Sequence, residues 1–484
     1  MNLTPPQVAV VGAGAAGLYT ALCSARLGAR VTLISAGPLA GASSYWAQGG
    51  LAAALAAGDS PERHLADTLA AGRGSVRESA ARVLVTEAPD AVADLTALGV
   101  HFDSDRDGQL SLGLEGGHSV RRIVHAGGAA TGRRIIRQLS ALAATDERID
   151  VIEGRRAIRI LTDDDSRATG LQLDDGSVIA AGAIVIATGG AAAMWQRTTN
   201  PAGATGSGLL LAHEAGARLA DVELMQFHPT AVVGGDGADG FLVTEAVRGE
   251  GARLINAAGE RFVDELAPRD EVARAVQAEI DAGDGRPVGL DMRHLDGAAL
   301  FPNVVAALRR AGIDSERELI PVAPAAHYMM GGIAVDLHGR SSLPGLYAVG
   351  EASCTGLHGA NRLASNSLSE CFVFGARAAA AAVAETVPGA APHPGAEPAA
   401  DAALPAASRA ALWRHAGLTR DGEGLRRLLA DPHPLVRLIA EGALAREESR
   451  GAHRRLDYPD LDPAMDGRHV TLVQRATPRT EAWD

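Results

Sequence analysis

The sequence predicts an α/β fold in which a domain with buried parallel strands is interrupted by an inserted domain and followed by a helical region. The first observation is an apolar run at 8–11, a glycine turn, a helical segment and a second apolar run at 30–34. The second is a change at about 223–337 to short strands and dense polar motifs, after which another buried strand follows at 345–351. The third is a Pro- and Ala-rich linker at 388–407, which precedes a segment with helical spacing.

The elements of the first domain can be placed in chain order. A helix is expected at 18–27 and a loop of small and polar residues at 41–50. The alanine-rich stretch 61–98 predicts two helices. Strands are expected within 151–186, with a turn at Asp174-Asp175-Gly176 and a last buried strand at 183–187.

Composition narrows the class of function. The 484 residues are 47% hydrophobic and 21% charged, which are ordinary values for a globular protein. The net charge of −13 disfavours nucleic acid and anionic membrane surfaces as partners. Lysine is absent, which excludes a lysine nucleophile. The three separated cysteines predict a reducing cytoplasm, no disulfide framework and no metal centre, and neither a signal peptide nor a membrane-spanning apolar stretch is expected.

The glycine turn predicts a dinucleotide site. It reads Gly12-Ala13-Gly14-Ala15-Ala16-Gly17 and lies between a strand and a helix, where the first glycine permits the turn and the helix N-terminus faces a pyrophosphate. An acid that would bind the adenosine ribose is missing, because Ser35 and Ala36 stand at the end of the second strand. Two further strand ends, Thr188-Gly189-Gly190 and Gly350-Glu351, favour FAD over NAD, since a longer nucleotide can contact all three.

Several motifs resemble one family of flavoproteins. Ser43-Ser44-Tyr45-Trp46-Ala47-Gln48-Gly49-Gly50 resembles the flavin-contact loop of the succinate dehydrogenase and fumarate reductase flavoprotein superfamily. Within that superfamily, six motifs in the same order resemble the L-aspartate oxidases: 226–230, 242–246, 248–252, 266–270, 325–328 and 359–362. The resemblance covers about 8–385 and returns at 448–451 and 456–459.

The resemblance implies an α/β FAD-binding Rossmann-like domain with an inserted α+β capping domain and a C-terminal helical domain. We therefore predict a discontinuous FAD-binding domain at 1–222 and 338–387, a capping domain at 223–337 and the linker at 388–407. A shortened helical domain and tail are expected at 408–484, with helical spacing at 412–450 and an irregular tail at 457–484.

The resemblance also implies the residues that contact FAD. They are Gly12, Ala13, Gly14, Ala15, Ala16, Gly17, Ser35, Ala36, Ser43, Ser44, Tyr45, Trp46, Ala47, Gln48, Gly49, Gly50, Thr188, Gly189, Gly190, Ser207, Glu351, Ser367 and Leu368. Relatives in membrane complexes attach FAD covalently through a histidine in the loop before Ala47, where this chain has Ser43. We therefore expect noncovalent FAD.

Four residues are expected to bind the two carboxylates of a dicarboxylate substrate. Arg362, with His327 beside it, resembles the clamp for one carboxylate, because a guanidinium group can form two parallel hydrogen bonds to it. His228 and Thr244 resemble the group that binds the other. The alternative for each histidine is a structural role.

Three residues are expected to act in catalysis. Arg269 corresponds to the family's catalytic arginine, with Glu245 as a neighbouring acid; the alternative for Arg269 is a salt bridge to Glu245 or Glu250. Glu115, in Leu114-Glu115-Gly116-Gly117-His118-Ser119, is expected to receive the substrate ammonium, which succinate lacks. The alternative for Glu115 is a solvated loop acid.

The implied reaction is FAD-dependent oxidation of L-aspartate to iminoaspartate, with reoxidation by oxygen or fumarate, as the first step of de novo NAD biosynthesis. One alternative is a soluble fumarate reductase or succinate-oxidising flavoprotein, and another is a flavin-binding scaffold or sensor without turnover. The expected partners are L-aspartate and oxygen or fumarate, with contact to quinolinate synthase left open. The protein is expected to be a cytoplasmic monomer or weak homo-oligomer.

Overall fold

The protein is built around a five-stranded parallel sheet with the order β17-β10-β1-β2-β6. The computed structural model describes residues 7–234, 238–385 and 404–484. The five strands are β1 (Gln7–Val11), β2 (Arg30–Ser35), β6 (Ile149–Glu153), β10 (Ala183–Ile186) and β17 (Leu346–Ala348). The predicted strands at 8–11, 30–34, 183–187 and 345–351 are thereby confirmed. They form because short apolar runs can be buried on both faces of a parallel sheet.

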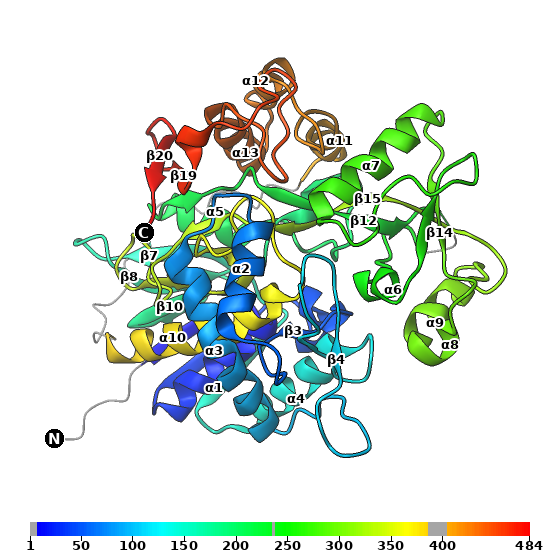
Figure 1. The fold of residues 1–484 in the computed structure, drawn as a ribbon. Helices are drawn as coiled ribbons and strands as arrows, with labels where there is room; N and C mark the ends of the chain where they lie inside the picture. Colours follow the sequence, from blue (N-terminus) through cyan, green and yellow to red (C-terminus); the bar gives the residue numbers. More distant parts are fainter. Residues whose placement is uncertain (1–6, 235–237, 386–403) are drawn as a thin grey trace.

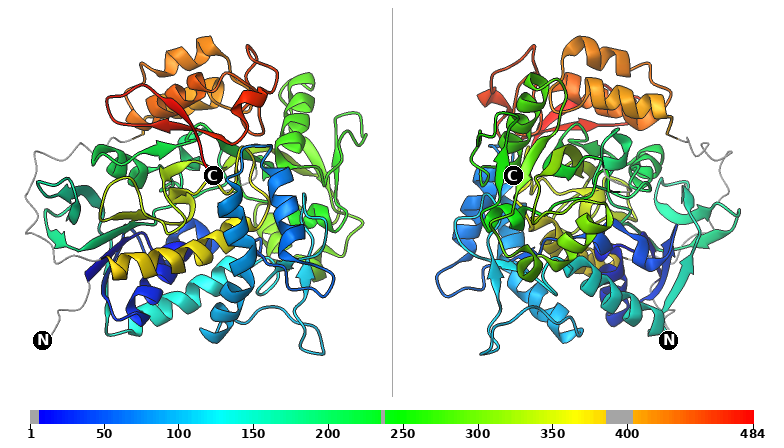
Figure 2. Two further views of the ribbon diagram at one scale, coloured as in Figure 1. Left: turned by 60° about the vertical axis from the view of Figure 1, so that its left-hand side comes forward. Right: turned by 90° about the vertical axis from the view of Figure 1, so that its right-hand side faces the viewer.

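Helices lie on one face of this sheet, where they pack against the strands and against one another (Figures 1 and 2). They are α1 (Ala15–Arg26), α2 (Pro61–Ala71), α3 (Glu78–Ala97), α4 (Thr131–Thr145) and α10 (Asn366–Ala384). The first helix begins at Ala15, three residues earlier than predicted, because the glycine turn itself supplies its first turn. The two helices expected within 61–98 are α2 and α3.

The long apolar helix α10 is a core element. Within the described ranges it is the one helix with the length and hydropathy of a membrane span, and Glu370 and Arg377 interrupt its apolar run. Two thirds of its most apolar window, 67%, is buried in the protein, where α10 packs against α1 and α3. Its apolar character therefore serves the hydrophobic core.

Two small sheets and several short turns complete the first domain. One sheet contains β3 (Leu51–Ala52), β4 (Leu112–Gly113) and β5 (Ile123–Val124); the other contains β7 (Ala157–Thr162), β8 (Ala168–Leu173) and β9 (Val178–Ala180). The predicted turn at 174–176 joins β8 to β9. The predicted loop at 41–50 contains part of η1 (Leu39–Gly41) and all of η2 (Ser43–Trp46).

The inserted segment forms its own antiparallel sheet and its own core. The sheet has the order β12-β15-β14-β13, with β12 (Met225–Val232), β13 (Arg253–Ile255), β14 (Val288–Asp291) and β15 (Ile320–Met329). Its helices are α6 (Glu245–Gly249), α7 (Arg269–Ala282), α8 (Gly297–Leu300) and α9 (Pro302–Arg310). This part projects to one side of the molecule in Figure 1. The α+β character predicted for the insertion is confirmed, and its exact boundaries stay a prediction.

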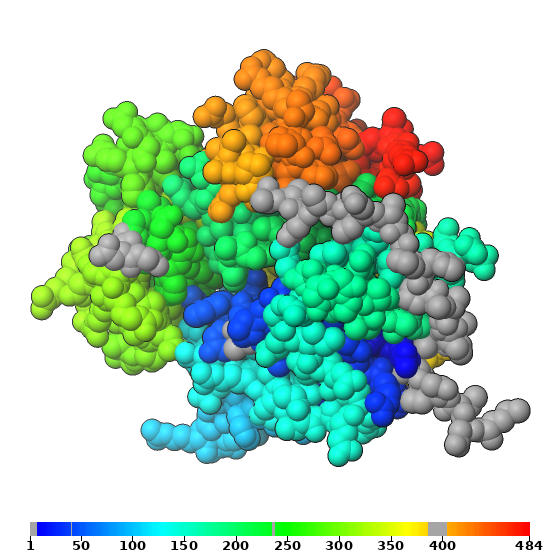
Figure 3. All heavy atoms as spheres, turned by 180° about the vertical axis from the view of Figure 1, so that it is seen from behind, coloured from blue at the N-terminus to red at the C-terminus, as the bar shows by residue number. Residues whose placement is uncertain are grey.

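The C-terminal part contains three helices and two strands. The helices are α11 (Ala406–His415), α12 (Gly422–Leu428) and α13 (Pro434–Ala445). Residues 388–403 of the predicted linker at 388–407 lie outside the described residues. Seen from behind in Figure 3, the orange atoms of this part lie beside the green atoms of the inserted segment.

The prediction of an irregular tail at 457–484 is wrong. This segment contains η5 (Pro463–Met465), β19 (Arg468–Leu472) and β20 (Arg479–Ala482). β19 joins a sheet of order β18-β16-β11-β19-β20 by pairing with β11 (Leu219–Ala220). The other strands of this sheet are β16 (Gly332–Ala334) and β18 (Ser353–Cys354). Five residues are too few to show a clear alternation of apolar and polar side chains. β19 forms because it pairs with β11.

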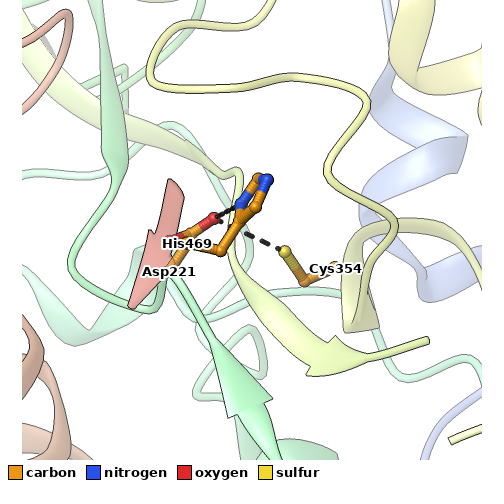
Figure 4. A group of neighbouring side chains, drawn as sticks. All are labelled: Asp221, Cys354 and His469. Atoms are coloured by element: carbon orange, nitrogen blue, oxygen red, sulfur yellow. Dashed lines mark hydrogen bonds and ion pairs between the residues drawn. The ribbon is translucent and has the colours of Figure 1, made fainter. Parts of the chain in front are cut away.

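A buried polar cluster fastens β19 to the rest of the protein (Figure 4). The carboxylate of Asp221 accepts hydrogen bonds from the ring of His469 and, at 3.8 Å, from the thiol of Cys354. Its other oxygen accepts from the backbone of Val470 and from Arg446, both at 2.9 Å. Four protein donors, one of them the guanidinium of Arg446, favour a structural clamp over a cation site.

Candidate active site

The glycine turn lies at the carboxyl ends of β1 and β2, where a dinucleotide is expected. Gly12 has φ +108°, and a Cβ there would overlap the carbonyl of Ala187 at the end of β10. A Cβ at Gly17 would overlap the carbonyl oxygen of Gly12, so this glycine permits the tight turn into α1. Ser44 accepts a hydrogen bond from the Ala15 backbone N–H at 3.2 Å, which brings the predicted flavin loop to the helix N-terminus.

The ribose end of the predicted site contains Ser35 and Ala36, and their contact with the cofactor stays a prediction. The Ser35 hydroxyl donates to the carbonyl of Gly37 at 2.6 Å, so its proton is already used by the chain, and Ala36 is exposed. Glu153 of the neighbouring strand β6 is in register with Ser35. Glu153 accepts from the Leu39 N–H at 2.7 Å.

The other two predicted nucleotide contacts meet at the ends of β10 and β17. Glu351 accepts a hydrogen bond from the Met329 N–H at 2.9 Å, and its side chain lies against Gly190. Burial raises the pKa of the Glu351 carboxyl to about 7. Thr188 points its buried hydroxyl toward Gly208, near Ser207 at the start of α5 (Ser207–Glu214).

The predicted flavin-contact loop connects the first domain to the inserted one. Gln48 donates to the carbonyl of Leu242 at 2.7 Å, while its buried side-chain oxygen has no protein partner. Gly49 lies beside Glu115 and Ser365, because a Cβ on Gly49 would be 3.2 Å from a Glu115 oxygen and 3.4 Å from the Ser365 hydroxyl. Tyr45 is partly buried, whereas Trp46 is 65% exposed and stands at the surface.

Two buried arginines converge on one glutamine side chain. The side-chain oxygen of Gln226 accepts from Arg269 and from Arg362, each at 3.2 Å. The amide nitrogen of Gln226 donates to the carbonyl of Arg362 at 2.8 Å and to Asn361 at 3.0 Å. Gln226 lies on β12 of the inserted sheet, so it fixes Arg269 of α7 relative to the loop that carries Arg362.

Arg362 retains one donor for a ligand. Its Nη1 donates at 2.6 Å to Ser367, which is predicted as a cofactor contact. Its Nη2 is buried and has no protein partner. Burial and the nearby Arg269 lower the pKa of Arg362 to about 10, and its guanidinium lies 4.4 Å from the centre of the Tyr328 ring. A buried unpaired guanidinium donor is costly unless an anion binds it.

Arg269 belongs to a buried row of alternating charges. Its Nε donates to Glu245 at 2.6 Å, and the other Glu245 oxygen lies 3.5 Å from Arg248. The salt bridge considered for Arg269 therefore exists with Glu245, whereas Glu250 faces Arg121 at 3.6 Å. Burial works to raise the pKa of Glu245, but the neighbouring arginines outweigh it and lower the pKa, which holds the carboxylate ionised.

His228 is oriented to donate a hydrogen bond into the site. Its Nδ1 accepts from the backbone N–H of Thr230 at 3.2 Å, which places the proton of a neutral ring on Nε2. That Nε2 is buried without a protein partner. Burial, with the positive charges of Arg269 and its neighbours, lowers the pKa of His228 well below its ordinary value. The ring is therefore a neutral donor.

His327 and Thr244 complete the predicted carboxylate contacts. The ring of His327 packs edge-on against that of His228, with centres 5.1 Å apart, and its Nδ1 is 2.7 Å from the Thr199 hydroxyl. Burial also lowers the pKa of His327 well below its ordinary value. Thr244 caps α6 by accepting from the Ala246 N–H at 3.4 Å, so it is held at the buried start of that helix.

Glu115 is a buried residue of the site. Its side chain accepts a hydrogen bond from Ser365 at 2.6 Å, and the residue is 2% exposed, which rules out the solvated loop acid considered above. Ser365 has φ +60°, a left-handed conformation that non-glycine residues adopt at a cost. The following Gly116 lies against Glu245, so Glu115 and the charged row are neighbours.

The residues present fit a flavin nucleotide and an anionic substrate. The glycine turn, the strand ends and the unpaired oxygen of Gln48 are compatible with FAD. The unpaired Arg362 Nη2 and His228 Nε2 are donors without acceptors, as expected for a site that binds carboxylates.

Sequence reasoning missed three residues of this site: Gln226, Arg248 and Ser365. Gln226 and His228 lie two apart on one strand and therefore on one face of it, which could have identified Gln226 from the motif alone. Arg248 lies three positions after Glu245 on a helix, the spacing of side-chain neighbours. No local pattern indicates Ser365, because its role depends on its backbone conformation.

The fold and the site together define an FAD-dependent oxidoreductase. The family model described as FAD binding domain matches residues 7–368, and that described as fumarate reductase flavoprotein C-term matches residues 429–481. Among solved structures, an E. coli quinol fumarate reductase chain is similar with a TM-score of 0.87 and 29% identity, covering 100% of this chain and 97% of that one. A Mycobacterium smegmatis Sdh1 structure gives a TM-score of 0.81 and 30% identity, covering 99% and 94%.

Curated relatives narrow this class. An L-aspartate oxidase of Caulobacter vibrioides is 48% identical over 96% of both chains. An L-aspartate oxidase of Streptomyces coelicolor is 42% identical, covering 96% of this chain and 91% of the relative. The chain belongs to the L-aspartate oxidase family within the succinate dehydrogenase and fumarate reductase flavoproteins. The predicted fold class, family and FAD cofactor are confirmed.

Proposed function

We propose that this protein oxidises L-aspartate to iminoaspartate with FAD, the first step of de novo NAD biosynthesis through quinolinate. The observation that carries this proposal is the buried carboxylate of Glu115 in a site otherwise rich in arginine. Such a carboxylate suits an ammonium group, which aspartate has and succinate lacks. The membership of the L-aspartate oxidase family supports the same substrate.

The balance of charge in the site favours aspartate over succinate. Three buried arginines, Arg248, Arg269 and Arg362, surround two buried carboxylates, Glu115 and Glu245. Their formal charges leave one net positive charge, which matches the net charge of −1 of aspartate. Succinate carries two negative charges and would leave Glu115 without a positive partner, a costly state for a buried carboxylate.

We assign the two substrate carboxylates to separate groups of donors. The free Nη2 of Arg362, with His327 beside it, binds one carboxylate. The Nε2–H of His228, with Thr244 nearby, binds the other. Both histidines are neutral, so they donate hydrogen bonds without adding charge, and the arginine supplies the electrostatic attraction.

Arg269 orients the substrate and stabilises charge during oxidation. Its contacts with Glu245 and Gln226 fix two of its nitrogens, so the guanidinium is rigidly positioned. The carboxylate of Glu115 binds the substrate ammonium and is suited to accept a proton that the amine releases. When bound, FAD supplies the two-electron acceptor, which oxygen or fumarate reoxidises.

We also propose that the protein works in the cytoplasm as a monomer or weak homo-oligomer and contacts quinolinate synthase. The contact is supported by the chemistry of the product, because an imine hydrolyses in water and direct transfer limits this loss. Crosslinking of the two purified proteins, with mass spectrometry of the linked peptides, tests it. Crosslinks no more frequent than with serum albumin would contradict the contact.

Product analysis tests the proposed reaction. Under air, L-aspartate is expected to yield hydrogen peroxide and, after hydrolysis of the imine, equal amounts of ammonia and oxaloacetate. Succinate is expected to yield none of these. Turnover of succinate at a rate similar to that of aspartate would favour a succinate-oxidising flavoprotein, and absence of any turnover would favour a flavin-binding scaffold.

A further inference from the structure

The end of helix α2 contacts both segments that carry the substrate arginines. The chain leaves α2 through residues 71–74, which we name the α2 turn. This turn lies outside every motif that pointed to substrate or cofactor. It nevertheless touches the loop before Arg362 on one side and the start of α7, which begins with Arg269, on the other.

The contact toward Arg362 is made by the backbone of the turn. The carbonyl of Ala71 accepts from the side chain of Asn361 at 3.1 Å. The carbonyl of Gly72 accepts from the N–H of Ala360, also at 3.1 Å. These two bonds hold the residues directly before Arg362 and are independent of any side chain in the turn.

The contact toward Arg269 is made by one side chain. Nη2 of Arg73 donates to both carboxylate oxygens of Asp270, at 3.1 and 3.2 Å, and to Glu271. The Asp270 side chain is only 3% exposed, and Asp270 directly follows Arg269 in the first turn of α7. A partly buried ion pair at this position restrains the end of the helix that presents Arg269.

The α2 turn is itself held in place by the C-terminal segment. Arg450 donates to the carbonyl of Arg73 at 2.6 Å and is fixed by Glu448 at 2.8 Å. Arg73 has φ +59°, a conformation that needs such external support. The buried Nε of Arg73 has no protein partner, but its Nη2 bonds to Asp270, and Arg274 donates to the carbonyl of Gly451 at 3.1 Å. These bonds favour a structural joint over a binding site for an anion.

We propose that Arg73 is a positioning residue that sets the place of Arg269 relative to Arg362. The inference rests on the proposed function, because it concerns the same substrate site. Without the Arg73 side chain, the start of α7 loses its direct ion pair with the first domain, while the bond of Arg269 to Gln226 and the backbone bonds that hold Arg362 remain. A displacement of about 1 Å at a reacting group can cost on the order of a hundredfold in rate.

The test compares Arg73→Ala with a matched control, Arg82→Ala. Arg82 is an exposed arginine of the neighbouring helix α3, where it pairs with Glu78 at 2.6 Å. Anaerobic stopped-flow measurement of flavin reduction by L-aspartate gives a limiting rate and an apparent affinity for FAD-loaded protein. Arg73→Ala is expected to lower the limiting rate by about tenfold or more, with an apparent affinity within about threefold of wild type. Arg82→Ala is expected to match wild type.

A merely structural role for Arg73 gives a different result. It would lower the thermal unfolding midpoint while each FAD-loaded molecule is reduced at the wild-type rate, and that outcome would overturn the proposal. If Arg73→Ala does not fold, Arg73→Lys retains the charge but loses the planar guanidinium. Its limiting rate is expected to fall at unchanged affinity, and a wild-type rate would again overturn the proposal.

Failure of the proposed function is distinguishable from failure of this inference. A wild-type flavin that L-aspartate does not reduce would contradict the function, whatever the variants do. The same variants are then compared in reoxidation of the reduced protein by fumarate. Fumarate also has two carboxylates, so this reaction depends on Arg269 and Arg362 as well. A wild-type rate for Arg73→Ala in that reaction would overturn the positioning role.

Discussion

Replacing Glu115 by glutamine should separate oxidation of aspartate from reduction of fumarate. Glutamine has nearly the same size and can still accept the 2.6 Å hydrogen bond from Ser365, so the fold around it is expected to persist. The substitution removes only the negative charge that we propose to pair with the substrate ammonium. Fumarate has no ammonium, so the substitution removes no charge-assisted contact that fumarate makes.

The size of the effect follows from burial. Glu115 is 2% exposed, and a hydrogen bond to a charged group contributes about 1.5–3 kcal/mol. This range corresponds to a loss of roughly 10- to 150-fold in the rate of flavin reduction at low L-aspartate concentration. Reoxidation of the reduced flavin by fumarate is expected to change by less than about threefold.

Stopped-flow absorbance of the flavin measures both half-reactions on the same preparation. Flavin reduction is followed after mixing with L-aspartate without oxygen, and reoxidation after mixing dithionite-reduced protein with fumarate. Glu115→Asp serves as a control, because it keeps the charge and shortens the side chain. Equal losses in the two half-reactions of Glu115→Gln would refute the role of Glu115 in binding the ammonium.

Three further outcomes follow from the structure. Gln226→Leu leaves donors of Arg269 and Arg362 without an acceptor and should lower the free energy of unfolding by about 3 kcal/mol; an unchanged urea midpoint would contradict this. Burial lowers the pKa of His64 from 6.5 to about 3, so the unfolded chain binds more protons and stability falls as pH drops below 6.5. Protonation of His64 alone should lower the free energy of unfolding by about 2 kcal/mol by about pH 5. A His64→Gln variant whose free energy of unfolding falls as much as that of wild type would exclude His64 as the cause. Because Ser43 replaces the linking histidine, acid precipitation should release all the flavin, and yellow precipitated protein would show a covalent bond.

Local patterns were sufficient for the framework of the cofactor domain. The apolar runs of β1, β2, β10 and β17 predicted the parallel sheet because such strands are buried on both faces. β19 could not be predicted in the same way, since five residues of mixed character form a strand only where β11 offers an edge. This strand therefore depends on a tertiary contact with β11, which a local sequence pattern does not reveal.

The candidate site shows the same division. The motifs predicted Glu115, His228, Arg269 and Arg362, and the structure brings them into one buried region. The connection between the two arginines, through Gln226, depends on the packing of the inserted sheet against the first domain and was not visible in either motif.

Two side chains predicted as cofactor contacts also form hydrogen bonds within the protein, and their contact with the cofactor stays a prediction. Ser367 bonds to Arg362 at 2.6 Å, and Ser35 bonds to the carbonyl of Gly37 at 2.6 Å. A motif gives the position of such a hydroxyl in the chain, but the direction of its hydrogen bond depends on which acceptor or donor the fold places beside it.

Anaerobic titration of the oxidised flavin tests the central claim most directly. L-aspartate and succinate are added separately to the FAD-loaded wild-type protein, and the flavin absorbance is followed. The site predicts complete bleaching by L-aspartate and none by succinate at the same concentration. Bleaching by succinate that equals that by L-aspartate would contradict the account, because the buried carboxylate of Glu115 would then have no part in selecting the substrate.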